Sequence, residues 1–120
     1  MQTAVILDNR CFHHEAGRLH IESPKRLHAI NDVLMGGGIG RELGRLEARH
    51  ATIEEISLIH DENYIRRVLA TRDRDFTQLD SDTGANRFTW EASQLAAGAS
   101  IVCAENVLDG KYRNAFAFVR

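Results

Sequence analysis

Four side chains near the start of the chain are of types that bind metal ions: Cys11, His13, His14 and His20. Thiolate and imidazole are good zinc ligands, and a zinc site needs three or four of them converging in space. The spacing here, C-x-H-H-x5-H, matches no strong zinc pattern. The sequence therefore predicts no metal site built from these residues alone. It favours a polar loop with some substrate-facing side chains.

Two other places in the chain could carry chemistry. His60, in LIHDENY, lies between two predicted helices, where a capping role is favoured over catalysis. Asp80 and Asp82, in LDSDTG, could form a carboxylate pair, but the Ser, Thr and Gly around them are typical of a turn. The chain contains no GxSxG, P-loop or GxGxxG motif. The sequence alone therefore identifies no catalytic residue.

The composition favours an ordered chain that binds neither DNA nor a membrane. Hydrophobic residues make up 43% and charged residues 27% of the 120 residues, with a formal net charge of -2. This balance supports a folded core, and it shows no basic excess of the kind that DNA binding needs. No apolar run approaches the ~20 residues that span a bilayer, and the start lacks a signal-peptide pattern. Cys11 and Cys103 form no CxxC unit, so we expect no disulfide framework and a cytoplasmic protein.

The first third of the chain predicts a strand, a loop and a helix. Residues Thr3–Leu7 (TAVIL) are apolar and β-branched, which is typical of a strand buried on both faces. A polar loop over residues 8–22 follows. Ser23 as N-cap and Pro24 as the first helical residue then begin a helix. Its apolar stripe and its glycine stop consist of Leu27, Ile30, Leu34 and residues 36–38.

The middle of the chain predicts short elements. A short strand is expected over residues 45–51. Thr52 and Glu55 form a capping box for a helix over residues 53–59, and Asp61 caps the next helix. Residues 71–80 (TRDRDFTQLD) are polar and are expected to form a surface loop.

The last third predicts a long helix and a second buried strand. The helix covers Thr89–Leu108, stops at Gly110, and carries small residues at 96–99 that suit close packing against a sheet. The strand covers residues 114–119 (NAFAFV). This order is α/β, and in such folds sites form at the carboxyl ends of parallel strands. The loop after the first strand is therefore a candidate site wall.

Six segments follow one another along the chain: HIESPKRL (residues 20–27), ATIEEI (51–56), IHDENYI (59–65), LDSDT (79–83), AAGA (96–99) and NAFAFVR (114–120). In this order they resemble motifs of the histone deacetylase-like amidohydrolases, a family that includes acetylpolyamine amidohydrolases and acetoin-utilisation proteins. The last segment resembles the strand that leads into Arg-Pro-Pro-Gly-His-His-Ala. One departure is Ile21, where the family usually has Pro.

The resemblance implies an α/β fold of the arginase/deacetylase type, with a parallel sheet flanked by helices. It covers nearly the whole chain, and residues 1–120 are expected to be one unit, the incomplete N-terminal portion of a deacetylase domain. In the intact family enzyme, zinc polarises an acetamide carbonyl and activates water, and a histidine takes the water proton. Acetate and a free amine result, from acetyl-lysine or acetylpolyamine. The family's paired histidines and zinc ligands would follow Arg120, so residues 1–120 alone are expected to bind no zinc and to be inactive.

The resemblance also assigns roles around the loop. Arg26 matches the family arginine near the inner end of the active-site tunnel, where acetate leaves, and a guanidinium can bind a carboxylate through two N–H groups. Alternatively, Arg26 pairs with an acidic side chain to hold the loop. Residues 10–22 would form part of the tunnel rim, with His13, His14 and His20 facing substrate or a partner subunit.

Two other functions stay open at this point. The chain could be a stand-alone binding or assembly module of the same family, without enzymatic activity. It could also be a small metal-binding protein that uses Cys11 and the loop histidines. Two apolar strands leave sheet edges exposed, through which a homo-oligomer could form. The substrate itself is not fixed by the sequence.

Overall fold

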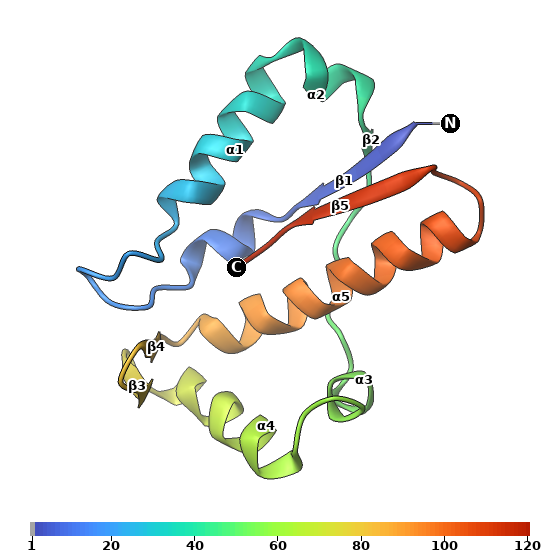
Figure 1. Cartoon of the computed structure of the whole chain (residues 1–120). Helices are drawn as coiled ribbons and strands as arrows, with labels where there is room; N and C mark the ends of the chain where they lie inside the picture. The colour runs from blue at the N-terminus through green and yellow to red at the C-terminus, as the bar shows by residue number, and fades with distance from the viewer. Residues whose placement is uncertain (1) are drawn as a thin grey trace.

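The computed structural model describes residues 2–120, and its centre is a three-stranded parallel sheet (Figure 1). The strand order is β2 (Gly44–Arg45), β1 (Thr3–Leu7) and β5 (Asn114–Phe118). In Figure 1 the long helix α5 (Thr89–Leu108) runs below the strands, and α1 (Lys25–Gly36) with α2 (Gly38–Glu42) lies above them. The α/β class predicted from the sequence is confirmed.

β1 occupies the middle of the sheet because its residues are apolar on both faces. Ala4, Val5 and Ile6 are buried, as the TAVIL pattern predicts. β1 pairs with β5 along its whole length, from Thr3 opposite Asn114 to Leu7 opposite Phe118, whereas the pairing with β2 is brief. The carboxyl ends of β1 and β5 therefore lie side by side.

The prediction of a strand over residues 45–51 is wrong, since β2 covers only Gly44–Arg45. The Leu46 N–H still donates to the Val5 carbonyl at 3.0 Å, and the chain then leaves the sheet. It runs along α5, where the Ala51 N–H donates to the Gln94 carbonyl at 2.9 Å and the Gln94 side chain donates to the Ala51 carbonyl at 3.2 Å. These backbone groups are satisfied by the helix, so no further strand partner is needed.

α5 has the predicted bounds and joins the two parts of the core. Ala99 and Cys103 pack on Ile6 of the sheet. One turn earlier, Leu95 packs against Leu27 of α1 and Cys11. The helix stops at Gly110, whose φ of +72° is a left-handed conformation that glycine adopts without strain, as predicted. Both cysteines are buried and free.

α1 begins one residue later than the sequence predicts. Pro24 is the N-cap, no side chain caps the helix, and the Pro24 carbonyl accepts the first helical hydrogen bond from the His28 N–H at 3.1 Å. The prediction of Ser23 as N-cap is therefore wrong. Leu27 and Leu34 are buried as the predicted stripe requires. The helix ends at the glycines, but Gly38–Glu42 forms the short helix α2, which the sequence did not indicate.

The middle of the chain forms the elements α3 (Ile53–Ser57), α4 (Glu62–Leu69), a 3-10 turn η2 (Ala70–Asp73), and a hairpin of β3 (Thr77–Asp80) with β4 (Thr83–Ala85). The capping box is confirmed: the Glu55 N–H donates to the Thr52 hydroxyl at 3.1 Å, and the Thr52 N–H donates to the Glu55 carboxylate at 2.8 Å. Asp61 caps α4 as predicted. The helix expected over residues 53–59 ends earlier, at Ser57.

The surface loop predicted over residues 71–80 is wrong, because η2 and β3 occupy most of it. β3 pairs with β4 in antiparallel fashion. At the turn between them the Asp82 N–H donates to the Asp80 side chain at 2.9 Å, so the prediction that these two residues form a turn is confirmed.

Two further sequence predictions concern surfaces. β5 is half-buried rather than buried, and Phe116 is 61% exposed, because β5 lies at the edge of the sheet. Within residues 2–120, no helix is long and apolar enough to cross a membrane.

Gly98 packs where no side chain fits, which generates a stability prediction. A Cβ at this position would lie 1.7 Å from the Arg49 carbonyl oxygen, so the glycine allows close contact with the 49–51 segment. Gly98→Ala should lower the free energy of unfolding by about 1–3 kcal/mol, although alanine favours helix. Gly36→Ala is the matched control, because a Cβ added at that position would have nothing within 4 Å. Thermal unfolding measures both, and equal stabilities of the two variants would contradict the packing argument.

Candidate functional site

The loop after β1 begins with the 3-10 turn η1 (Asn9–His13), which is held by an ion pair and by an apolar contact with the core. Asp8 caps it by accepting from the Arg10 N–H at 2.9 Å, and the Arg10 guanidinium lies 2.8 Å from the same carboxylate. This contact holds the pKa of Asp8 below its ordinary value. Cys11 points inward and is completely buried against Leu27 and Leu95. Cys11 therefore anchors the loop to the core and is not available to a ligand set with the histidines.

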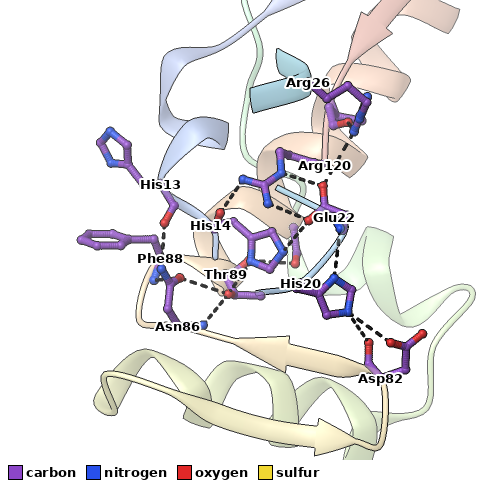
Figure 2. A network of polar contacts seen from close by, with 12 residues as sticks. His13, His14, His20, Glu22, Arg26, Asp82, Asn86, Phe88, Thr89 and Arg120 are labelled. Carbon is purple, nitrogen blue, oxygen red and sulfur yellow. Dashed lines mark hydrogen bonds and ion pairs between the residues drawn. The ribbon is translucent and has the colours of Figure 1, made fainter. Parts of the chain in front are cut away.

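The structure places the three loop histidines in different surroundings (Figure 2). His13 is exposed and packs edge-on against the Phe88 ring, with 5.4 Å between ring centres. The His20 Nε2 lies 3.0 Å from the Asp82 carbonyl and 3.2 Å from its carboxylate, while Nδ1 accepts from the Glu22 N–H at 3.0 Å. Since Nδ1 accepts, Nε2 carries the ring proton and donates to Asp82. His20 thus ties the loop to the β3–β4 hairpin.

His14 is half-buried and contacts the start of α5. Its Nδ1 lies 2.8 Å from the Thr89 hydroxyl, and its Nε2 lies 3.7 Å from the Glu22 carboxylate. Burial first, and the nearby Arg120 cation second, lower the pKa of His14 below its ordinary value. The ring is therefore neutral near pH 7 and acts as a hydrogen-bonding group.

Arg120 is the most enclosed charged group of the site. Its side chain is 1% exposed, and it meets the Glu22 carboxylate through two contacts, Nε to Oε1 at 2.8 Å and Nη2 to Oε2 at 2.6 Å. Its third nitrogen donates to the His14 carbonyl (Figure 2). Hydrogen bonding to Arg120 holds the pKa of Glu22 below its ordinary value. The ion pair therefore joins the carboxyl end of β5 to the loop after β1.

Arg26 lies beside this pair. Its Nη2 donates to the Val119 carbonyl at 3.1 Å and lies 4.0 Å from the Glu22 carboxylate. These contacts fit the holding role considered for Arg26, in which it pairs with an acidic side chain. A role in a product channel stays a prediction.

A groove of about 640 Å³ opens beside the loop. Its lining residues come from the loop and from the hairpin side: Glu15, Gly17, Arg18, Asp75, Phe76 and Asn86. Asn86 also donates to the His13 carbonyl at 2.8 Å, so the groove and the loop share one wall. The groove combines charged walls with one aromatic face.

The residues described offer no site for zinc. Within residues 2–120, no group of three or more His, Cys, Asp or Glu side chains lies close enough to hold a metal ion. His13, His14 and His20 each have another partner, as described above. The zinc that the family resemblance implies therefore does not fit these residues.

Comparisons with known proteins agree with this geometry. A family model described as the histone deacetylase domain matches residues 20–120. Histone deacetylase 15 of Arabidopsis thaliana is 34% identical over 124 residues, covering 98% of this chain and 22% of that protein. A probable deacetylase of Archaeoglobus fulgidus is 30% identical over 122 residues, covering 100% of this chain and 34% of that protein.

A solved structure and a human protein add to these relatives. The crystal structure of the HDA15 HD domain matches with a TM-score of 0.89 at 31% identity, covering 98% of this chain and 36% of that one. Polyamine deacetylase HDAC10 of Homo sapiens is 34% identical, covering 83% of this chain and 16% of its own length.

The chain belongs to the histone deacetylase family. The resemblance to deacetylase-like amidohydrolases is thereby confirmed, as is the parallel sheet flanked by helices that it implied. This deacetylase-family chain spans between 16% and 36% of the length of the proteins named above.

The sequence did not single out Glu22 and Arg120. Both lie in segments that carry the family resemblance, HIESPKRL and NAFAFVR, but neither was assigned a role there. One signal was present: an arginine directly after an apolar strand needs a partner if the strand end is buried. The partner could not be named, because it lies 98 residues away in the sequence.

The lowered pKa of His14 predicts a pH dependence of stability. The unfolded chain binds a proton on His14 as the pH falls below about 6.5, whereas the folded chain resists it. The free energy of unfolding should therefore fall as the pH drops from 7.5 towards 5. Below about 4.5, protonation of Glu22 should weaken the fold further, because its folded pKa is also lowered.

Urea unfolding at pH 7.5, 6.0 and 5.0 measures this effect. His14→Gln should flatten the dependence between pH 7.5 and 5, and the exposed His60→Gln should leave it in place. An unchanged slope in the His14 variant would remove His14 as its cause.

Proposed function

We propose that residues 1–120 form the first wall of the active site of a deacetylase that hydrolyses acetylated amines to acetate and free amines. The observation that carries the proposal is the joining of the loop after β1 to the carboxyl end of β5 by Glu22 and Arg120. In α/β folds, sites form at the carboxyl ends of the parallel strands. Family membership supplies the reaction class.

Zinc dependence is part of the proposal, with the ligands contributed by residues other than 2–120. A zinc ion bound by such ligands would supply Lewis-acid chemistry to the substrate carbonyl and to water. The residues described here would bind and orient the substrate and exclude water. Arg26 can also serve the reaction, because its half-exposed guanidinium has N–H groups left for a carboxylate product.

The substrate class proposed is an acetylated amine, either acetyl-lysine or an acetylpolyamine. Two relatives are named for such activities, a histone deacetylase and a polyamine deacetylase. The groove beside the loop supports this class, since Phe76 offers an apolar face, and Glu15 and Asp75 offer carboxylates for a cationic amine. His13 and the Phe88 ring would form the rim above it.

Purified residues 1–120 should not hydrolyse an acetyl-lysine reporter and should bind no stoichiometric zinc, because no three-ligand cluster lies within residues 2–120. The measurements are a fluorogenic deacetylase assay with and without added zinc, and metal analysis after dialysis. A full-length deacetylase provides the positive control. Robust turnover that requires zinc would refute the proposal that the ligands lie elsewhere.

A role in assembly is a second proposal, favoured by the free edge of β5. β5 ends the order β2-β1-β5, so its outer backbone groups lack a strand partner within the sheet, and Phe116 is exposed beside them. An unpaired edge with an apolar residue is a surface on which another strand can pair.

Light scattering at rising protein concentration tests this second proposal. We expect a dimer for the wild type, and Phe116→Lys should shift the equilibrium towards monomer by placing a charge at the edge. A wild type that stays monomeric at high concentration would exclude the edge as an assembly surface.

A further inference from the structure

The Glu22–Arg120 pair connects the loop after β1 to the chain beyond β5 through two short contacts. Arg120 lies two residues beyond the end of β5, and all of its recorded side-chain hydrogen bonds go to the loop, two to Glu22 and one to the His14 carbonyl. A lysine could not make this set, because its single nitrogen lacks the planar fork that a carboxylate matches with two bonds. The contact therefore depends on both charge and shape.

His14 is held by the same group of residues from two sides. Its carbonyl accepts from Arg120, and its ring lies between the Thr89 hydroxyl and the Glu22 carboxylate. The Thr89 oxygen already accepts from the Asn86 N–H at 2.8 Å, so its own proton is available to His14 Nδ1. The alternative acceptor, the Asn86 side chain, is more distant at 3.2 Å. When the Thr89 hydroxyl donates to Nδ1, the neutral ring carries its proton on Nε2, which lies 3.7 Å from the Glu22 carboxylate.

We propose that Glu22 and Arg120 are positioning residues, whose ion pair holds the His14 ring in one orientation between Thr89 and Glu22. The proposal rests on the proposed function only where it describes His14 as part of a deacetylase site wall. The positioning itself is a property of residues 14, 22, 89 and 120. It is tested without any measurement of activity, so it can fail or hold independently of the proposed function.

The first experiment is a double-mutant cycle with Glu22→Gln, Arg120→Met and the double variant. Removing Glu22 alone leaves the almost fully buried Arg120 charge without its partner, which costs more than removing both groups. Hydrogen exchange by NMR reports on the loop through the His20 and Glu22 amides, both of which are hydrogen-bonded within it. Each single variant should accelerate this exchange by about tenfold, and the double variant should accelerate it by less than the product of the two.

Glu54→Gln is the matched control, because Glu54 is exposed and no ion pair is recorded for its side chain within residues 2–120. It should leave loop exchange unchanged. Loop exchange in Glu22→Gln equal to that in Glu54→Gln, or single effects that multiply in the double variant, would overturn the proposal.

The second experiment measures the pKa of His14 by NMR titration, with His14→Gln used to assign its signal. If Glu22 acts only as a nearby negative charge, neutralising it should lower the pKa of His14 further, because the imidazolium loses an attraction. If Glu22 positions the ring, its loss should free His14 from burial, and the pKa should rise towards about 6.5. We expect the rise, and a fall would refute the positioning role.

Conservative variants keep the test decisive if Glu22→Gln does not fold. Glu22→Asp and Arg120→Lys keep both charges but disturb the two-point contact, so each should accelerate loop exchange by less than Arg120→Met does. Exchange at the α5 amides, which should stay slow, separates loosening of the loop from global unfolding. Conservative variants that exchange as slowly as the wild type would show that the two-point contact is not needed, and this would contradict the proposal.

Discussion

Parallel pairing of β1 with β5 is the constraint on which the site wall depends. Because the two strands run in the same direction, their carboxyl ends lie side by side at the same end of the sheet, with Leu7 opposite Phe118. The chain between them must return along the whole sheet, and α5 makes this return by packing Ala99 and Cys103 on Ile6. The loop after β1 consequently meets the end of β5, although they are separated by most of the chain.

Elements specified by neighbouring residues were predictable from the sequence. The apolar run of β1, the capping box of α3 and the bounds of α5 each depend on contacts within a few residues or on one apolar face. β2 was not predictable in the same way. Its apolar continuation resembles a strand, but the Gln94 side chain and backbone of α5 take over the hydrogen bonds at Ala51, which the local pattern cannot show.

The candidate site also combines features that the sequence indicated with features that depend on distant contacts. The family resemblance indicated the loop, Arg26 and the three histidines, and the structure brings His14 and Arg26 close to Glu22. It turns His13 and His20 towards other partners, Phe88 and Asp82. Side-chain direction within an irregular loop depends on contacts with distant segments, and these follow from the strand register and not from residue spacing.

The loop is held at its two ends by interactions of opposite character. Near its start, Cys11 is buried among Leu27 and Leu95, an apolar contact that is insensitive to charge. Near its end, Glu22 is fixed by a guanidinium that water barely reaches, so this contact depends on ionisation. A loop fixed at both ends loses less conformational entropy when it binds a ligand, which favours a preorganised wall. Because the Cys11 contact is apolar, changes in Arg120 should loosen the His14 end of the wall while Cys11 keeps its place in the core.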